Sequence, residues 1–378
     1  MESDILIVGG GVAGLSLGAA LSPHRRVTVL EAEEAIGHHS SGRSATFSHF
    51  GIGNEIVRGL TAASRAFFKQ PPDGFSEAPL VRTATALFVA TEAMRATLDK
   101  LEEVMRPHAP DIRRVDEAEM RALFPPLRTG PGAVVAGIVD FDGLRLDADA
   151  LLQGYARSIR SNGGKVLTAA RVAAVEAKAG TWSVVTETGE RHAAPILVNA
   201  AGAWADGLAG MANVAPLGLR PLRRTIIIVD PPEGADATRW PFVKTAVDDF
   251  YILPEGGRLA ASPVDEVPDD PCDAQPEDYD IALAAWKVEE YTTLSVPRVQ
   301  HRWAGLRTFA SDRTPVAGFD PIAPGFFWLA GQGGFGLQTA PAMAEAAASL
   351  ILSTSWPEQL AALGISPHDL GPERLIHG

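Results

Sequence analysis

The residues with the clearest chemical meaning stand near the start of the chain. An apolar run, Ile5–Val8, leads into the glycine-rich segment GGGVAG, and an Ala- and Leu-rich stretch follows. In a strand, turn and helix of this kind, Gly9 permits the tight turn, Gly11 lets the backbone approach a pyrophosphate, and Gly14 lets helix and strand pack closely. The segment predicts a dinucleotide-binding site; the plain alternative is an ordinary turn between a strand and a helix.

An acidic residue closes the next apolar run and supports this interpretation. Glu31 follows Val27–Leu30 at the distance from the glycines that suits hydrogen bonds from the adenosine ribose hydroxyls. A carboxylate there also repels a 2′-phosphate, so NADP is disfavoured. The glycines alone would be weak evidence. A dinucleotide-binding site is indicated more strongly when a strand, a turn, a helix, a second strand and an acid follow in this order.

A second glycine run, at residues 331–336, allows two interpretations. It could be a second dinucleotide fingerprint, as in pyridine-nucleotide and flavin disulfide reductases. However, only one helix follows it, and no strand with a terminal acid comes after that helix. The run therefore favours a helix N-terminus that points at the redox end of the same cofactor, where its dipole would stabilise the negative charge of a reduced flavin.

No other catalytic centre competes with the glycine motifs. The nine histidines show no ligand spacing such as a pair one helical turn apart, and the single cysteine, Cys272, cannot build a structural zinc site. We therefore expect no metal site.

The bulk composition fits a soluble enzyme with more than one unit. The chain has 378 residues, whereas a domain usually has about 150. The net charge of −13, without a basic run, argues against a nucleic acid or an anionic membrane as partner. One cysteine excludes internal disulfides and fits a reducing compartment, so we expect a cytoplasmic location.

The N-terminal apolar run is expected to be a strand and not a signal peptide. Glu2 and Asp4 flank its start, and no basic region precedes it. Because a helix needs about eighteen uninterrupted apolar residues to cross a bilayer, and the chain has no such run, we expect no membrane span.

Hydrophobic periodicity divides the remaining chain into an α/β part and an antiparallel part. Strands after residue 224 are expected to form a separate antiparallel sheet, before the chain returns to a strand, turn and helix at 326–352. The Pro- and Asp-rich stretch 265–280 is expected to be an irregular surface excursion. Predicted helices are 62–69, 92–106, 114–123, 146–161 and 341–352; predicted strands are 165–167, 173–177, 182–186, 191–192, 196–202, 224–229, 250–253, 258–261 and 326–330.

Several motifs carry a resemblance to a known family. Besides the N-terminal fingerprint they are GHHSSGRS at 37–44, NAAGAW at 199–204 and GQGGFGLQT at 331–339. In this order, over nearly the whole chain, they resemble the glycine and D-amino acid oxidase family of FAD enzymes. The segments LTAASRAFF at 60–68, PLGL at 216–219 and WAGLR at 303–307 are similar to the bacterial D-arginine dehydrogenases within it.

This resemblance implies the fold and its division. The fold class is α/β, with a Rossmann-type FAD-binding domain and a second, mostly antiparallel β-sheet domain that binds substrate. The implied FAD-binding domain is discontinuous and comprises residues 1–46, 144–217 and 305–378. The implied substrate domain comprises residues 47–143 and 218–304.

The resemblance also implies FAD, held without a covalent bond. Members with covalent flavin use a cysteine near the closing motif, whereas Cys272 lies elsewhere. In such relatives residues 41–44 run along the cofactor, Val172 lies against the adenine, and residues 334–339 contact the pyrimidine edge; for 41–43 a plain loop is the alternative. The implied cofactor contacts are Gly9, Gly11, Val12, Ala13, Gly14, Glu31, Ala32, Ser41, Gly42, Arg43, Ser44, Val172, Ala201, Gly202, Trp204, Gly305, Arg307, Gly334, Phe335, Gly336, Leu337, Gln338 and Thr339.

Three residues match positions that grip the substrate carboxylate in D-arginine dehydrogenases: Arg224, Tyr251 and Arg307. A planar guanidinium can meet both carboxylate oxygens, and a tyrosine hydroxyl adds a donor. Arg224 is expected to stand at the mouth of an otherwise apolar strand face; the alternative is that both arginines are surface residues at sheet ends. His49 is a candidate general base or substrate contact, with a packing role as the alternative.

Departures from those relatives bear on the substrate. The acid that receives a guanidinium there aligns with Ala86, a lid tyrosine with Ile52 and a pocket histidine with Phe47, so the pocket should suit a neutral side chain better than a basic one. Lys244 replaces an apolar residue. We expect it to be solvated; if it pointed inward, it would favour an acidic substrate.

The sequence therefore predicts an FAD-dependent oxidoreductase that oxidises a small amino acid, of D configuration, by hydride transfer from Cα to flavin N5. The imino acid would hydrolyse to a 2-oxo acid and ammonia. Oxidation of an N-substituted amino acid or a 2-hydroxy acid is the alternative, and a flavin-binding module without turnover is a third possibility. The electron acceptor, whether oxygen, a quinone or another molecule, stays open.

Overall fold

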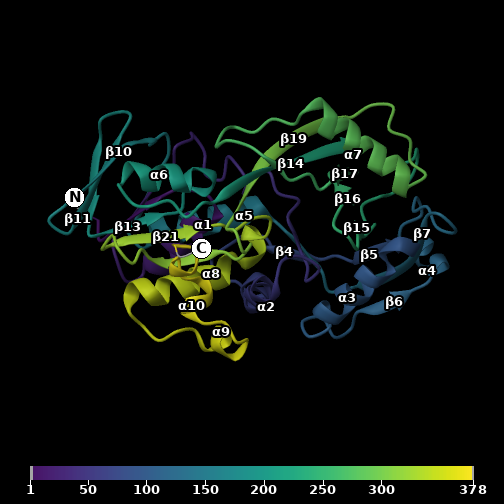
Figure 1. Ribbon diagram of the computed structural model, residues 1–378, viewed down its shortest axis with the longest axis horizontal. Helices are drawn as coiled ribbons and strands as arrows, with labels where there is room; N and C mark the ends of the chain where they lie inside the picture. The colour runs from purple at the N-terminus through teal and green to yellow at the C-terminus, as the bar shows by residue number, and fades with distance from the viewer. Residues whose placement is uncertain (1–2, 377–378) are drawn as a thin grey trace.

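Residues 3–376 are described by a computed structural model, so Glu2 of the N-terminal prediction lies outside the described part. Figure 1 shows an elongated molecule, with β10, β11 and β13 near one end and β5, β7, α3 and α4 at the other. Within residues 3–376 no helix is both long and apolar enough to cross a membrane.

A six-stranded sheet forms the first layer. Its order is β20-β21-β13-β1-β2-β9, and all neighbours are parallel except β20 and β21. The strands are β1 (Ile5–Val8), β2 (Val27–Leu30), β9 (Lys165–Leu167), β13 (Ile196–Asn199), β20 (Val316–Phe319) and β21 (Phe326–Ala330). Three distant parts of the sequence thus share one sheet, because β13 pairs with β1 and β21 pairs with β13.

Helices cover one face of this sheet and a small sheet covers the other. The helices α1 (Val12–Leu21), α5 (Ala148–Ser161) and α8 (Gly336–Leu352) share one hydrophobic core with β1 and β2. On the opposite face lie α6 (Ala205–Met211) and the antiparallel strands β10 (Val172–Lys178), β11 (Thr181–Thr186) and β12 (Arg191–Ala194). Both faces are therefore buried, as a parallel sheet requires.

A nine-stranded, mostly antiparallel sheet forms the other layer. Its order is β18-β14-β17-β16-β15-β5-β7-β6, with β19 also paired to β14; only β15 and β5 are parallel. The strands are β5 (Ala86–Thr91), β6 (Arg113–Val115), β7 (Val134–Asp140), β14 (Arg220–Val229), β15 (Phe242–Thr245), β16 (Tyr251–Glu255), β17 (Arg258–Ser262), β18 (Val267–Pro268) and β19 (His301–Phe309). The predicted α/β fold with a second antiparallel sheet is confirmed.

Short elements connect the layers. The strands β3 (Phe47–Ser48), β4 (Val81–Thr83) and β8 (Leu144–Leu146) form a small third sheet. The remaining helices are α2 (Glu55–Lys69), η1 (Glu92–Met94), α3 (Arg95–Met105), α4 (Glu117–Leu123), α7 (Asp278–Tyr291), η2 (Gly202–Trp204), α9 (Glu358–Ala362), α10 (Pro367–Leu370) and α11 (Glu373–Ile376). The predicted domain boundary at residue 305 falls inside β19, and the division into segments stays a prediction.

Three helices begin at residues other than the predicted ones. α2 begins seven residues before the predicted 62, because the Asn54 side chain caps it by accepting from Val57 N–H. The predicted helix 114–123 is wrong at its start: β6 occupies 113–115, and a capping box of Asp116 and Glu119 opens α4. α8 begins at Gly336 and not at Pro341, which lies inside the helix.

The stretch 265–280 corrects the sequence prediction in another way. It is largely irregular, but α7 begins at Asp278 within it, and Asp265 and Ala274 are buried, so it is not a plain surface excursion. α7 packs its Ala284 and Val288 against the nine-stranded sheet. The start of α7 carries little local signal, because its N-cap residue Glu277 makes no side-chain capping hydrogen bond.

Two glycines of the fingerprint are fixed by close backbone contact. Gly9 has φ +114°, and a Cβ there would lie 2.2 Å from Ala200 O. A Cβ on Gly14 would lie 2.0 Å from Gly9 O. Neither contact can be relieved by moving a flexible side chain, so both positions require glycine.

Gly14→Ala should therefore destabilise the protein and reduce its cofactor content. The added methyl would push α1 away from the turn at Gly9, and overpacking of this kind costs about 1–3 kcal/mol. The matched control is Gly207→Ala in α6, where a Cβ would meet nothing within 4 Å, so a neutral or slightly stabilising effect is expected. Thermal unfolding and bound-flavin absorbance of both variants measure the difference; equal behaviour would contradict this account.

Candidate active site

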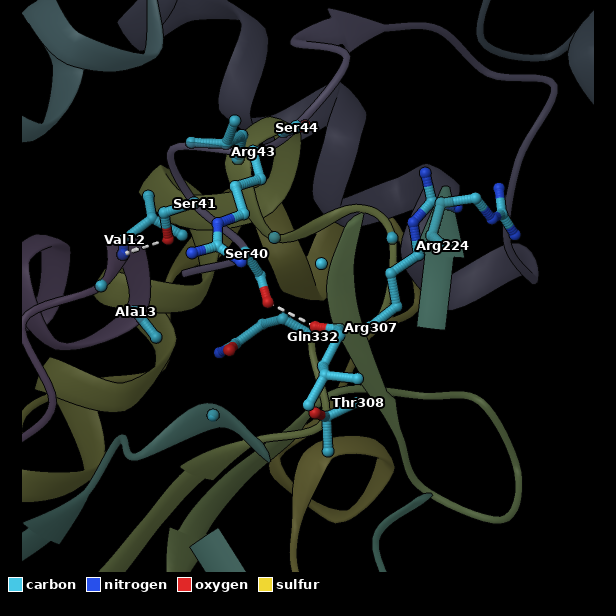
Figure 2. Close-up of a pocket in the computed structure, with 18 of the residues that line it drawn as sticks. Val12, Ala13, Ser40, Ser41, Arg43, Ser44, Arg224, Arg307, Thr308 and Gln332 are labelled. Atoms are coloured by element: carbon cyan, nitrogen blue, oxygen red, sulfur yellow. Dashed lines mark hydrogen bonds between the residues drawn. The ribbon is translucent and has the colours of Figure 1, made fainter. Parts of the chain in front are cut away.

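One cavity runs from the fingerprint to the closing glycine run. Its walls include Gly11, Val12 and Ala13 at one end and Arg224 and Arg307 at the other. Figure 2 shows both guanidinium groups together at the end opposite Val12 and Ala13. The fingerprint and the two arginines, more than 200 residues apart in sequence, thus belong to one site.

At the fingerprint end, the predicted ribose acid is held in place. Glu31 is buried and accepts hydrogen bonds from Gly10 N–H (2.7 Å) and Glu33 N–H (2.9 Å). The Ser41 hydroxyl accepts from Val12 N–H at 3.0 Å, so the 37–44 segment contacts the start of α1 (Figure 2). Each carboxylate oxygen of Glu31 keeps a further lone pair for a ligand hydroxyl.

The structure brings only part of the predicted cofactor set to the cavity wall. Predicted residues on the wall are Gly11, Val12, Ala13, Ser41, Arg43, Ser44, Gly202, Gly305, Arg307, Gly334, Gly336 and Leu337. The predicted residues outside that wall are Gly9, Gly14, Glu31, Ala32, Gly42, Val172, Ala201, Trp204, Phe335, Gln338 and Thr339. Which residues bind the cofactor stays a prediction.

Some residues of the second group have clear local roles. Gln338 is buried and ties α8 to the 47–50 segment and α2: it accepts from His49 N–H and donates to Thr61 Oγ1. Thr339 Oγ1 donates to Phe335 O within the helix start. Trp204 packs against the His39 ring.

Three polar wall residues were not predicted. Ser40 donates its hydroxyl to Leu306 O, while Gln332 Nε2 and Thr308 Oγ1 are buried without a hydrogen-bond partner among the described residues. Gln332 lies inside the closing glycine motif, and Thr308 directly follows Arg307. Their position next to predicted site residues is the sequence signal that could have identified them.

Arg43 lines the cavity, but its guanidinium is already engaged. It donates to the carbonyl oxygens of Ala274 (3.2 Å) and Ala304 (3.1 Å) and pairs with Asp273. Trp303 Nε1–H in turn donates to Arg43 O at 2.9 Å. Arg43 therefore fixes the 273–274 segment and β19 beside the cavity.

The two arginines at the far end of the cavity lie close together but differ in their hydrogen-bond and ion-pair partners. Arg224 is buried; its Nε donates to Asp265 O at 2.7 Å, and its Nη2 lies 3.4 Å from Glu266 Oε1. Burial, and next the Arg307 charge, lower the pKa of Arg224 to about 10. The Arg307 guanidinium has no hydrogen-bond or ion-pair partner within residues 3–376.

Arg224 is not a surface residue at a sheet end, because it is 4% exposed. It lines the cavity together with Ile226, two residues further along the same strand. The β14–β19 ladder pairs Leu222 with Arg307, so Arg224 and Arg307 project from the same face of the sheet.

Tyr251 is not among the residues that line the cavity, but it lies in the hydrophobic cluster that contains the wall residue Ile226. Its side chain is buried, and its hydroxyl has no hydrogen-bond partner among the described residues. The ring lies beside Phe242, with centroids 5.6 Å apart. A buried hydroxyl without a partner is costly unless a ligand supplies one.

Lys244 is not solvated, contrary to the sequence prediction. It is 3% exposed, and its Nζ donates to Gly51 O at 3.0 Å and pairs with Asp248 Oδ1 at 3.0 Å. Burial lowers its pKa, and Asp248 opposes that shift. The prediction that Lys244 is solvated rests on the residue type alone, because the local sequence carries no sign that β15 is an interior strand.

Aromatic side chains lie next to Lys244. The His49 ring lies 5.5 Å from Phe88 and 5.1 Å from Phe242, and Phe47 stacks on Phe242 at 4.6 Å between centroids. Ala86 is fully buried on β5 opposite Phe242.

His49 is buried and neutral. Burial, and next the Lys244 charge, lower its pKa well below the ordinary value of 6.5. Its Nδ1 accepts from Gly51 N–H at 3.0 Å, so the single ring proton of the neutral form is on Nε2. In this state His49 can donate to a ligand but has no free nitrogen to accept a proton.

Residues 4–350 match the sequence model of the family described as FAD dependent oxidoreductase. The chain belongs to this family. It is 25% identical over 415 residues to a Bos taurus protein, FAD-dependent oxidoreductase domain-containing protein 1, covering 93% of this chain and 81% of that one.

Solved structures are similar in fold. The L-proline dehydrogenase from P. horikoshii superposes with a TM-score of 0.85 at 20% identity, covering 100% of this chain and 98% of that one. Glycine oxidase from Geobacillus kaustophilus gives a TM-score of 0.82 at 19% identity, covering 97% and 99%.

FAD is the cofactor, and the cavity fits it. A Cβ on Gly11 would lie 3.2 Å from Ser41 Oγ, so the glycine keeps the passage beside the start of α1 open. The orphaned polar atoms of Gln332 and Thr308 face a space that needs a polar ligand. α8, with seventeen residues, begins at Gly336 on the same wall. Cys272 is exposed and does not line this wall, in keeping with noncovalent FAD.

One group of side chains outside the cavity wall has the atom types that bind metal ions. Ligand atoms of Glu33, His38 and His39 lie within 4.8 Å of one another. However, Glu33 Oε1 already pairs with Arg171 Nη2 at 2.6 Å and with His39 Nε2 at 3.1 Å. These contacts make the group an ion-pair cluster on the rim of the fold.

Replacing His49 by Asn should make the protein less sensitive to acid. Because the folded chain keeps His49 neutral, the unfolded chain binds one more proton as the pH falls below 6.5, and stability falls with it. From pH 6.5 to about pH 5.5 this group should cost about 1 kcal/mol. An Asn oxygen can still accept from Gly51 N–H, so the variant should lose less stability than the parent.

Urea unfolding of both proteins at about pH 7.5 and pH 5.5 measures this effect. His24→Asn, at an exposed position, is the control and should behave like the parent. Equal acid sensitivity of the His49 variant and the parent would show that His49 is not held neutral.

Proposed function

We propose that this chain oxidises a small D-amino acid at the bond between Cα and nitrogen, giving an imino acid that hydrolyses to a 2-oxo acid and ammonia. The observation that carries the proposal is the arrangement of Arg224, Arg307 and Tyr251. Two guanidinium groups project from one sheet face at one end of the cofactor cavity. Tyr251, whose buried hydroxyl has no partner among the described residues, lies in the hydrophobic cluster of the cavity residue Ile226.

The charges at this end require an anion. Arg307 has no counter-ion within residues 3–376, and Arg224 reaches its nearest carboxylate oxygen only at 3.4 Å. That carboxylate, Glu266, is shared with Arg313 at 2.7 Å. Two like charges in a buried site repel each other, and a substrate carboxylate would relieve this repulsion while accepting from both guanidiniums and from Tyr251.

Bound FAD supplies the hydride acceptor for such an oxidation. The protein then has to fix Cα, and a carboxylate held at two oxygens does so. Tyr251 donates to one of these oxygens, and the aromatic wall around His49 excludes water from the reacting bond.

The absence of a ready base favours an amine over an alcohol. His49 Nδ1 already accepts from Gly51 N–H, so this imidazole offers no free acceptor for a hydroxyl proton. An amine can bind in its neutral form and needs no base at the moment of oxidation. Glycine oxidase and L-proline dehydrogenase among the similar structures also act on amino acids. The D configuration rests on the motif likeness to D-arginine dehydrogenases.

Arg307→Ala should lower kcat/KM by more than tenfold, because losing one partner of a buried charge pair costs about 2–5 kcal/mol. FAD content should persist, since other residues hold the cofactor. Arg302→Ala is the control: Arg302 is exposed and alternates to the opposite face of β19. Steady-state rates with a D-amino acid and flavin absorbance measure both effects; unchanged kinetics, or loss of flavin alone, would contradict the assigned role.

Basic D-amino acids should be poorer substrates than neutral ones. Ala86 offers no charge to a basic side chain, and Lys244, Arg224 and Arg307 would repel it. An unpaired buried charge costs several kcal/mol, so D-leucine should exceed D-arginine in kcat/KM by about tenfold or more. Anaerobic flavin reduction with each amino acid measures the ratio of the two kcat/KM values. A higher kcat/KM for D-arginine than for D-leucine would overturn the prediction.

A further inference from the structure

A further buried cation, Lys244, lies on the same nine-stranded sheet as Arg224, Tyr251 and Arg307. Lys244 on β15 is paired in register with Tyr251 on β16, so both side chains project from the same sheet face. Two residues earlier on β15, Phe242 contacts the rings of Tyr251 and His49. Lys244 is therefore the cross-strand neighbour of the tyrosine whose hydroxyl lacks a partner.

The ammonium group of Lys244 is only partly satisfied. It has three N–H donors, and the structure assigns two of them, to Gly51 O and to Asp248 Oδ1. The Asp248 side chain is 48% exposed, whereas that of Lys244 is 4% exposed. Water therefore screens the acid better than the base, and one donor of a buried cation is left for a ligand.

We propose that Lys244 binds a second anionic group of the substrate, so that the preferred substrate is an amino acid with a carboxylate side chain. This inference rests on the proposed function, because Arg307, Arg224 and Tyr251 hold the first carboxylate. Lys244 is then the residue that determines specificity at the side-chain end of the pocket.

A purely structural role for Lys244 makes a different prediction. If the lysine only anchors Gly51 and Asp248, its loss should impair all substrates by a similar factor. If it binds a carboxylate, its loss should impair only substrates that carry one. Pairs of substrates with equal shape and different charge separate the two roles.

The first experiment uses the holoenzyme and two such pairs, D-glutamate with D-glutamine and D-aspartate with D-asparagine. Anaerobic flavin reduction should be faster per encounter with at least one acid than with its amide, by about tenfold or more in kcat/KM. If both amides have kcat/KM values equal to those of their acids, the inference is overturned while the proposed function stays intact.

The second experiment compares Lys244→Met with Lys287→Met. Lys287 is the matched control because it pairs with Asp249, on the same turn as Asp248, at 2.6 Å. Lys244→Met should remove the acid-over-amide ratio, lowering kcat/KM for the acid by about tenfold or more and for the amide by less than about threefold. Lys287→Met should keep the ratio. An unchanged ratio in Lys244→Met, or an equal loss for acid and amide, would overturn the inference.

A binding measurement on the unmodified holoenzyme covers the case in which the variant does not fold. Glutarate should perturb the flavin spectrum with a Kd at least about tenfold lower than that of glutaramate, its monoamide. Equal affinities would overturn the inference. If none of the amino acids reduces the flavin but glutarate still binds more tightly than glutaramate, the proposed oxidation fails and the role of Lys244 stands.

Discussion

The cofactor cavity exists because three parallel strands end at one edge of the same sheet. β1, β13 and β21 are neighbours in register, and the loops that follow them carry residues 9–13, 200–202 and 331–336. Their contact is made by backbone: a Cβ on Gly9 would lie 2.2 Å from Ala200 O. The position of α1, the start of α8 and the path of the 37–44 segment all follow from this contact.

The nine-stranded sheet contributes buried charge to the other side of the cavity. Arg224 and Lys244 are almost fully buried, and Arg307 lines the cavity without a counter-ion within residues 3–376. Burying positive charge costs free energy unless anions compensate it. Of the acids that contact these groups, Asp248 and Glu266 are partly exposed, and the buried Asp265 carboxylate reaches Arg224 Nε only at 3.8 Å. This imbalance suits a site whose ligands bring negative charge.

Local elements were predictable where the pattern was strong. The strands β9, β13 and β21 and the hairpin of β11 and β12 lie at the predicted places, since apolar runs bounded by glycine or polar turns indicate them. The strands β5, β7 and β15 were missed. Each is buried within the nine-stranded sheet and pairs with partners distant in the sequence, and such pairing leaves no local signal.

The sequence by itself determined the kind of protein: the order of strand, glycine turn, helix and acid indicates a dinucleotide fold, and the motif order indicates FAD. These features are local, because a turn or helix start needs particular residues at fixed spacing. Only the tertiary structure decided which side chains share the site. It buried Lys244 beside Tyr251, fixed the ring proton of His49 and tied Arg43 to Ala304. Burial and hydrogen-bond partners depend on strands far apart in the chain, so residue type could not reveal them.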